Sequence, residues 1–322
     1  MPRVGQIAQL WRFPVKSMAG ERLERAEVGE LGVVGDRLWA VRDEERGHIT
    51  GGKRLPSLMA CSARFLAEPT ADAVDDRVPP VAITLPDGAE LVSDQPDASA
   101  RLSAFLGRRV TLCPRRPADQ RAHYRGPRAT AADMRLQFGL GPDDPMPDFS
   151  MFPTAMLVEL ARYATPPGTY LDAYALHVLT SASLAELGRL APAADIAPLR
   201  FRPNLLVDSE ETGFVENGWC GGALRAGDLV GRVEIPTVRC SMVTREQPGL
   251  GADPSVLKAL VDHTRRCAGV YARVEQAGAV RVGDAVELEP ATPTRVGGWM
   301  RSGARSLRRL ALRATAAVLP EE

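Results

Sequence analysis

The sequence predicts a mainly β protein that also contains a few helices, an α+β fold class. Short runs of strand character, separated by glycine, proline and aspartate, fill most of the first third of the chain. Helical spacing is found in shorter stretches, at residues 97–106, 180–187 and 254–268. With 322 residues, of which 45% are hydrophobic and 25% charged, the chain can bury one large core or two ordinary cores.

The N-terminal part divides into short strands and turns, which predicts a compact β domain over residues 1–113. The turn-like segments Asp43–Gly47 and Pro86–Gly88 each follow a run with strand character. The expected strands cover residues 5–13, 37–42, 81–85 and 109–113, and a short helix is expected at residues 97–106.

A segment rich in proline, glycine, arginine and aspartate follows, and its weak periodicity over residues 114–148 predicts a linker or a lid. We extend this segment to residue 165, so that a second domain spans residues 166–290. In that domain Ser183 stands three residues before Glu186, which is typical of a capping box at the start of a helix. Strands are predicted at residues 204–208, 229–235 and 280–288, and a helix at residues 254–268.

The composition narrows the functional classes. Forty basic residues balance forty acidic residues, so net charge gives no argument for a nucleic-acid partner, and we expect none. The five cysteines form neither a CxxC pair nor a disulfide framework, which favours a reducing, cytoplasmic location. We also expect neither secretion nor a membrane span, because no run approaches about 20 apolar residues and the first residues lack a signal-peptide pattern.

Cys240 is distinguished from the other cysteines by its neighbours. It follows Arg239 in a loop, downstream of a second arginine-rich segment at Arg200–Asn204. A thiolate is a soft metal ligand, and a flanking guanidinium lowers the thiol pKa and binds phosphate, so the pairing predicts a metal cofactor with an anionic tail. The alternatives for Arg202 and Asn204 are a surface charge and a turn cap. The cysteines expected to be structural or to fill space are Cys61, Cys113, Cys220 and Cys267.

A second group of donors lies near the N-terminus. Lys16 and Ser17 follow Pro14 and Val15, which should hold the backbone extended so that an ammonium and a hydroxyl reach one phosphate. Arg37, oriented by the preceding aspartate, adds a bidentate contact. The alternative is that Lys16 is a solvated lysine and that the Asp–Arg neighbours form an ordinary ion pair, worth under about 1 kcal/mol.

The motifs of this chain, in the order in which they occur, resemble those of the MOSC family, which is named for the C-terminal domain of molybdenum cofactor sulfurase. The form it resembles is the one with an N-terminal β-barrel domain. The resemblance runs from Ile7 to Leu288, and its motifs are Phe13–Ser17, Gly35–Trp39, Phe201–Asn204, Arg239–Cys240, Gly269–Tyr271 and Val282–Asp284. It implies an N-terminal β-barrel-like domain packed on a MOSC β-barrel domain. Its reductase branch, which includes the mitochondrial amidoxime-reducing component, implies that Cys240 ligates molybdenum. The residues implied to hold the pterin and its phosphate are Lys16, Ser17, Arg37, Arg202, Asn204 and Arg239.

The resemblance also makes Asp172 the acid near the metal. A carboxylate there could accept or relay the proton that oxygen removal from a substrate requires, and its alternative is a turn residue that caps the next element. Tyr174 and Ala175 stand where the mitochondrial branch has a small hydroxyl residue and a proline, which puts the pocket wall and the substrate in doubt. His177 lies in an apolar run and is expected to be a core or edge histidine; no zinc or iron site is assigned.

The predicted function is a molybdenum cofactor-binding oxidoreductase that reduces N-hydroxylated or N-oxide substrates, with Cys240 and Asp172 as its catalytic residues. The alternatives are a carrier of sulfur or cofactor that uses Cys240 as a persulfide, and a scaffolding relative without metal. We expect no iron–sulfur cluster in this chain, because it has no cysteine-rich ferredoxin segment. Electrons must then come from a separate ferredoxin, flavoprotein or b-type cytochrome.

The tail, residues 291–322, predicts a basic amphipathic helix. Arginines recur at spacings of three and four between residues 295 and 319, with apolar residues between them and no acidic residue. Three interpretations stay open: peripheral attachment at the inner face of a membrane with Trp299 as an anchor, docking of an acidic electron donor, and packing on its own domain.

Overall fold

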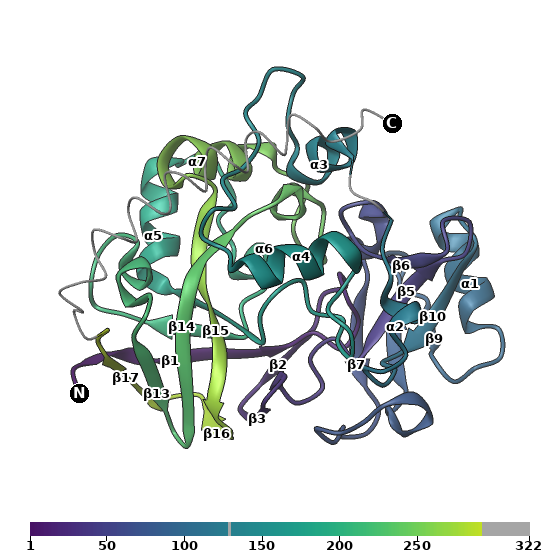
Figure 1. The fold of residues 1–322 in the computed structure, drawn as a ribbon, viewed down its shortest axis with the longest axis horizontal. Coiled ribbons are helices and arrows are strands. Elements are labelled where there is room, and N and C mark those ends of the chain that lie inside the picture. Colours follow the sequence, from purple (N-terminus) through teal and green to yellow (C-terminus); the bar gives the residue numbers. More distant parts are fainter. Residues whose placement is uncertain (128–129, 292–322) are drawn as a thin grey trace.

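A computed structural model describes residues 1–127 and 130–291, and it confirms a mainly β protein with additional helices (Figure 1). Its largest element is a closed β barrel in which the strand order is β12-β11-β15-β14-β13-β17-β1, and β1 pairs again with β12. These strands are β1 (Arg3–Arg12), β11 (Leu176–Thr180), β12 (Leu205–Asp208), β13 (Ala223–Ala226), β14 (Leu229–Val238), β15 (Cys267–Gln276) and β17 (Ala285–Glu289). All these pairs are antiparallel except β11 with β12, which is parallel.

Strand β1, near the N-terminus, pairs with strands of the C-terminal half. Although it belongs to the N-terminal part of the chain, it pairs with β12 and β17 in the barrel, and β2 (Glu21–Leu23) adds to its other end. Its apolar side chains Val4, Ile7 and Leu10 are buried in the barrel core with β-branched residues of the distant strands. They recur at every third residue because the register of β1 shifts against β17 and again against β12. The domain boundary drawn at residue 113 therefore assigns to the N-terminal domain a strand that completes the C-terminal barrel.

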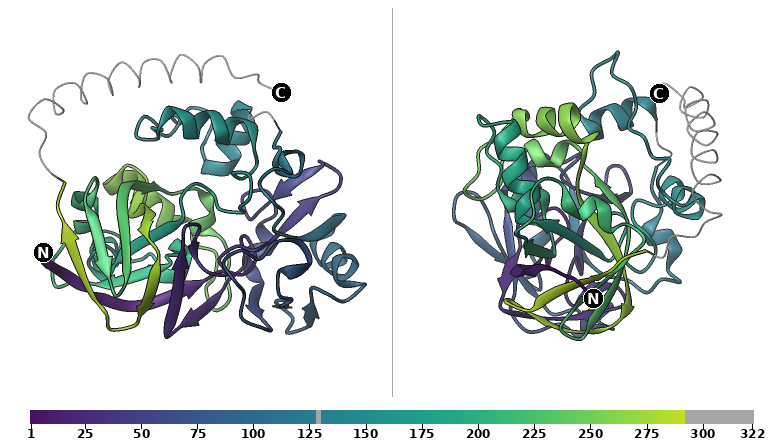
Figure 2. Two further views of the ribbon diagram at one scale, coloured as in Figure 1. Left: turned by 60° about the horizontal axis from the view of Figure 1, so that its bottom comes forward. Right: turned by 90° about the vertical axis from the view of Figure 1, so that its left-hand side faces the viewer.

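The rest of the N-terminal part lies beside the barrel and consists of small antiparallel sheets (Figure 2). One contains β5 (Trp39–Asp43), β6 (His48–Thr50) and β10 (Val110–Pro114); another contains β7 (Ser62–Phe65), β8 (Val81–Thr84) and β9 (Glu90–Val92). A third joins β3 (Arg25–Gly29) and β4 (Gly32–Val33) to β16 (Gly278–Arg281) of the C-terminal half. The first two of these sheets and α1 (Ala98–Leu106) enclose a separate apolar core, whereas the third contributes Ala26, Val28, Val33 and Val280 to the core of the barrel.

Helices cover one side of the barrel and the connection between the two halves. Helices α5 (Ser181–Leu190), α6 (Pro198–Phe201) and α7 (Pro254–Thr264) share an apolar cluster with the short 3₁₀ turn η4 (Ser241–Thr244). The predicted linker contains α2 (Arg121–Tyr124), α3 (Ala131–Phe138) and α4 (Thr154–Arg162). The remaining 3₁₀ turns are η1 (Pro56–Ala60), η2 (Asp75–Arg77) and η3 (Val215–Trp219).

The linker segment contacts both halves of the molecule. Thr130 caps α3 by accepting a hydrogen bond from the Asp133 amide, and Asp133 pairs with Arg54 of the N-terminal part at 2.9 Å. On the other side, the Ser241 hydroxyl donates to the carbonyl of Gln137 at 2.9 Å. Helix α3 is therefore tied to both sides of the region that contains Cys240.

Three elements expected from the sequence differ in the structure. Helix α7 ends at Thr264 because Arg265 and Arg266 adopt left-handed backbone angles, and strand β15 then begins within the predicted helix at Cys267. The predicted strand at 280–288 is two strands, β16 and β17, separated by a turn at Gly283. The predicted capping box is wrong, because the N-cap of α5 is Thr180.

Thr180 accepts from the Ser183 amide at 3.1 Å and donates to the buried carboxyl of Glu216 at 2.7 Å. A capping box would require the Ser183 hydroxyl to accept a hydrogen bond from an amide in the first turn of the helix. In the structure this hydroxyl instead donates to Glu216. A polar network thus links the start of α5 to η3 inside the protein.

The predicted amphipathic tail, with its arginines and Trp299, lies outside the described residues. Among the helices of residues 1–127 and 130–291, none combines the length and hydropathy that crossing a bilayer requires.

The Thr180 network gives a first prediction. Thr180→Ala removes both the helix cap and a hydrogen bond to a buried carboxyl, so we expect it to lower the free energy of unfolding by about 2–3 kcal/mol. Urea denaturation measures this loss. Thr180→Ser keeps the hydroxyl and should retain most of the stability; an equal loss in both variants would contradict the assignment.

Candidate functional site

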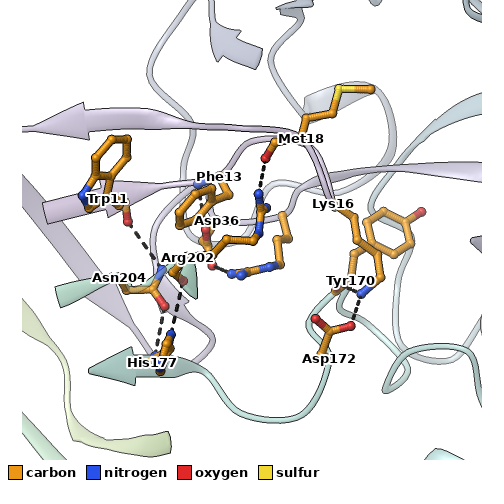
Figure 3. A network of polar contacts seen from close by, with 11 residues as sticks. Trp11, Phe13, Lys16, Met18, Asp36, Tyr170, Asp172, His177, Arg202 and Asn204 are labelled. Carbon is orange, nitrogen blue, oxygen red and sulfur yellow. Dashed lines mark hydrogen bonds and ion pairs between the residues drawn. The ribbon is translucent and has the colours of Figure 1, made fainter. Parts of the chain in front are cut away.

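The candidate site lies where loops from both halves of the chain meet at one end of the barrel (Figure 3). Strand β1 leads directly into the loop of Phe13–Met18, which forms backbone hydrogen bonds with Arg37 and Trp39 of the N-terminal part. The loop before β11 contributes Asp172, the residue after α6 is Arg202, and the end of β14 leads to Arg239 and Cys240.

Two guanidinium groups are held against the ring of Phe13. The Arg202 carbon Cζ lies 4.2 Å from the ring centroid and that of Arg37 lies 5.3 Å from it. Arg202 donates from Nη1 to the carbonyl of Met18 at 2.6 Å. Asp36 accepts from the Phe13 amide at 2.8 Å and also forms an ion pair with Arg37, so it orients both ring and guanidinium.

The backbone at these positions is unusual. Ser17, Arg37 and Arg202 have φ angles of 73°, 52° and 54°, a left-handed region that side chains with a Cβ rarely adopt. Each such residue costs on the order of 1 kcal/mol or more, and strain of this kind is retained where function requires it. Three strained residues in one group of donors point to a binding site.

Lys16 and Asp172 form an ion pair across the two halves of the chain. The Lys16 ammonium donates to the Asp172 carboxylate at 2.7 Å and to the Tyr170 carbonyl at 2.9 Å. Burial lowers the pKa of Lys16, although Asp172 partly opposes that effect. Burial alone would raise the pKa of Asp172, but the nearby cations Lys16, Lys53 and Arg37 outweigh it and hold the pKa below its ordinary value. Asp172 is therefore ionised near neutral pH.

The segment that carries Cys240 is fixed on both sides. Arg239 donates from Nη2 to the Phe201 carbonyl at 2.7 Å, and its amide donates to the Arg266 carbonyl at 2.7 Å. Cys240 itself is half-buried and directly precedes η4, whose Val243 is fully buried against α7. The other four cysteines fit the structural role expected of them, because burial raises the pKa of each thiol to about 11 or 12.

Several donors at this site have no partner. Nη2 of Arg202 and Nε of Arg239 are buried without a hydrogen bond. The Ser17 oxygen accepts from the Gly52 amide at 2.8 Å, which leaves its hydroxyl proton available. Burial and the proximity of Arg37 lower the pKa of Arg202 to about 9. Buried, unpaired guanidinium nitrogens are costly, so the arrangement fits an anionic ligand with several acceptor oxygens.

Asn204 and His177 are bound to the backbone. The Asn204 side chain accepts from the His177 amide at 3.1 Å and donates to the Trp11 carbonyl at 3.4 Å, so it joins the starts of β11 and β12 to β1 (Figure 3). The His177 ring lies between the carbonyls of Arg202 and Ala268, each at 3.3 Å. Burial lowers its pKa to about 3, so it is neutral, as expected of a core histidine. Both residues position Arg202; the predicted contact of Asn204 with a cofactor stays a prediction.

Lys53 was not predicted from the sequence. Burial would lower its pKa, but interactions with Asp172, Cys240 and Tyr271 outweigh this effect and raise it. The sequence feature that could have indicated Lys53 is the pair of glycines directly before it. A Cβ on Gly51 would lie 2.7 Å from the Ser17 oxygen, and a Cβ on Gly52 would lie 2.7 Å from the sulfur of Met59, so neither position has room for a side chain. Close packing of this loop on Ser17 brings Lys53 to the site.

The charges at the site are mainly positive. Five cationic side chains, Lys16, Lys53, Arg37, Arg202 and Arg239, accompany the two carboxylates of Asp36 and Asp172. Within the described part of the chain, no group of three or more histidine, cysteine or acidic residues is arranged to hold a metal ion.

Comparison with known proteins identifies the class. Residues 166–287 match the family model of the MOSC domain, and residues 4–106 match that of the MOSC N-terminal beta barrel domain. The chain is thus a two-part member of the MOSC-domain proteins, which confirms the family inferred from its motifs.

Among curated proteins, the chain is similar to mitochondrial amidoxime-reducing components. That of mouse (Mus musculus), component 1, is 24% identical over 319 residues, which cover 89% of this chain and 83% of the relative. Component 2 of Rattus norvegicus is 25% identical over 332 residues, with 89% and 84% covered. Component 2 of Bos taurus is 33% identical over 69 residues, 20% of each chain. A crystal structure of the YUAD protein from Bacillus subtilis, at 11% identity, 90% and 97% coverage and a TM-score of 0.41, is too distant to support an argument.

The Lys16–Asp172 pair gives a prediction about stability and pH. Because the pKa of Asp172 is lowered, the pair stabilises the fold above the unfolded pKa of about 4, and this contribution is lost as pH falls through the lower folded value. The Asp172 side chain is 42% exposed, so we expect Asp172→Asn to cost only about 1 kcal/mol near neutral pH.

Urea denaturation from neutral to acidic pH checks this, with Lys16→Met and the double variant completing a double-mutant cycle. The coupling should begin to decline as the pH falls below about 4 and should vanish only below the lowered pKa of folded Asp172. A coupling that grows as the pH falls would contradict the assignment.

Proposed function

We propose that this chain binds the molybdenum cofactor and reduces N-oxygenated substrates, such as amidoximes or N-oxides. The observation that carries the proposal is a half-buried thiol, Cys240, next to a group of cations in which Arg202 and Arg239 keep buried nitrogens without partners. Such a site needs an anion to complete it, and the thiol provides one soft ligand for a metal. The similarity to amidoxime-reducing components supports the reaction class.

The donors at the site fit a pterin that carries a phosphate. Arg202, Arg37 and Ser17 come from separate loops, and each provides a donor to the region around Phe13. Arg239 and Lys53 link this group of cations to Cys240, because each interacts electrostatically with that cysteine. We assign Ser17, Arg37, Arg202 and Arg239 to the anionic tail and Cys240 to the metal.

When bound, the cofactor would supply the electron pair and accept the oxygen atom of the substrate. The chain's own residues would manage protons, since cleavage of an N–O bond with release of water consumes two electrons and two protons. Burial lowers the pKa of the Lys16 ammonium and makes it a better proton donor than a free lysine. Asp172 contacts Lys16 and is itself 42% exposed, so the ion pair borders the solvent from which Lys16 regains its proton.

The structure refines the role expected for Asp172. An ionised carboxylate with a lowered pKa is a weak base, so we propose that Asp172 holds the Lys16 ammonium charged and in place and that Lys16 delivers the proton. Electrons would come from a separate ferredoxin, flavoprotein or b-type cytochrome, which must dock close to Cys240.

The decisive experiment expresses the protein in a host that makes the pterin. We expect stoichiometric molybdenum and turnover of an amidoxime with an artificial reductant, both lost in Cys240→Ser. Cys220→Ser, at the second half-buried cysteine, is the matched control and should behave as wild type. Turnover that survives in Cys240→Ser would overturn the proposal, and labile sulfane sulfur without molybdenum would favour the carrier instead.

Arg202 offers a test that separates ligand binding from folding. Removal of a charge-assisted contact worth about 1.5–3 kcal/mol should weaken retention of the pterin about 10- to 100-fold in Arg202→Met. The same change should alter the free energy of unfolding of the cofactor-free protein by no more than about 1 kcal/mol, because a buried cation repelled by Arg37 is exchanged for an apolar side chain.

Pterin content after gel filtration and urea denaturation provide the two measurements. Arg189→Met on the exposed side of α5 is the control and should leave retention unchanged. Full retention of the pterin in Arg202→Met would contradict the assignment of the anionic tail.

A further inference from the structure

Helix α3 bridges the two segments that carry Lys53 and Cys240. At one end of the helix, Asp133 pairs at 2.9 Å with Arg54, the residue directly after Lys53. At the other end, a backbone carbonyl of the last turn accepts at 2.9 Å from the hydroxyl of Ser241, the residue directly after Cys240. Because Lys53 and Cys240 also interact electrostatically, the helix connects two sides of one site.

The C-terminal end of α3 is anchored by several contacts. Arg266 donates from Nη1 to the Phe138 carbonyl at 2.8 Å, and the Arg266 carbonyl accepts from the Arg239 amide. The Phe138 ring is buried and lies 5.4 Å from that of Phe149, which in turn lies 5.9 Å from that of Phe152, measured between ring centroids. These hydrogen bonds and aromatic contacts hold this end of the helix against the segment of Cys240.

The N-terminal end of α3 is held mainly by charge. Of the eight residues that the structure describes in this helix, Phe138 alone is buried, and Leu136 is 55% exposed. Arg54 and Asp133 are only 18% and 22% exposed. Burial would raise the pKa of Asp133, but Arg54 outweighs this effect and lowers it, so the carboxylate is charged near neutral pH. An element with few buried apolar contacts opens locally at a low cost in free energy, so the loss of one ion pair releases this end.

We propose that α3 is a strap that limits access to Cys240 and that the Arg54–Asp133 ion pair is its latch. When the latch opens, α3 turns about its anchored end at Phe138, and the loop of Lys53 is released from the segment of Cys240. A larger molecule then reaches the thiol. The same movement sets how fast an anionic cofactor enters and leaves; this last step rests on the proposed function, whereas the latch rests on the contacts alone.

The test measures how fast maleimides of two sizes label Cys240 in the cofactor-free, full-length protein. The probes are N-methylmaleimide and a maleimide joined to a polyethylene glycol chain, and Cys240→Ser gives the background from the other cysteines. A change in the acidity of the thiol alters both rates equally, whereas an open strap favours the bulky probe. We expect Asp133→Asn to raise the ratio of the bulky rate to the small rate about two- to fivefold at low salt. The difference from wild type should shrink at high salt, which screens the latch.

Arg54→Met removes the same ion pair from its other side and should raise the ratio by a similar factor. The double variant should exceed neither single variant, because the latch is lost only once. The control is Asp262→Asn, which removes an exposed carboxylate of α7 that pairs with Lys258 and should leave the ratio unchanged. Equal acceleration of both probes, effects that multiply in the double variant, or no response to Asp133→Asn would overturn the strap.

Hydrogen exchange measures whether the effect is local. In Asp133→Asn the amides of α3 should exchange faster, while those of β14 and β15 should keep their wild-type rates. Faster exchange in these strands as well would mean that the substitution loosens the whole fold, and it would contradict a latch.

Failure of the proposed function gives a different result. Protein that contains no molybdenum and turns over no amidoxime refutes the reductase, and the labelling ratios still decide whether the strap exists. In protein that carries the cofactor, Asp133→Asn should release the pterin about two- to fivefold faster than the wild type. Release at the wild-type rate would overturn the link between the strap and cofactor exchange.

Discussion

The pairing of β1 with β12 and β17 is the constraint on which the rest of the structure depends. It closes the barrel with a strand from the opposite end of the sequence, and Val4, Ile7 and Leu10 of that strand help to fill the barrel core. The chain leaves β1 at the rim of the barrel, so Phe13 lies against Arg202 and Lys16 against Asp172 (Figure 3). A slip of one residue in this register would turn the apolar side chains outward and displace the whole loop.

The group of cations assembled at this rim is unfavourable for the protein alone. Guanidinium groups are buried close to each other, nitrogens of Arg202 and Arg239 lack partners, and Ser17, Arg37 and Arg202 adopt strained backbone angles. A purely structural network would satisfy its donors, as the Thr180, Ser183 and Glu216 network does elsewhere in the same barrel domain. The contrast between the two networks is the physical reason to assign a ligand to the first.

Polar residues around the site fall into distinct physical roles. Asp36, Asn204 and His177 hold the backbone and orient the cations, while Lys16 and Asp172 join a buried ammonium to a partly exposed carboxylate. Tyr271 interacts electrostatically with Asp172, Lys53 and Arg239, and its ring stacks on that of Tyr174.

Local patterns were enough to predict much of the architecture. The turn sequences and alternating runs predicted strands at β5, β8, β10, β12 and β14, and the motifs around Lys16, Arg37, Arg202 and Cys240 predicted which residues belong to the site. Errors arose where a local signal was overridden: Arg265 and Arg266 end α7 early through left-handed backbone angles, and Ser183 bonds to Glu216 while Thr180 caps the helix.

The sequence by itself determined the composition of the site, because a cysteine, a carboxylate and a set of cations define the possible chemistry wherever they meet. Only the tertiary structure decided that Asn204 faces the backbone, that Lys53 joins the site, and that Tyr174 lies against Tyr271. Each of these depends on contacts between residues far apart in the sequence. Such contacts are set by barrel closure and loop packing, for which local propensity holds no information.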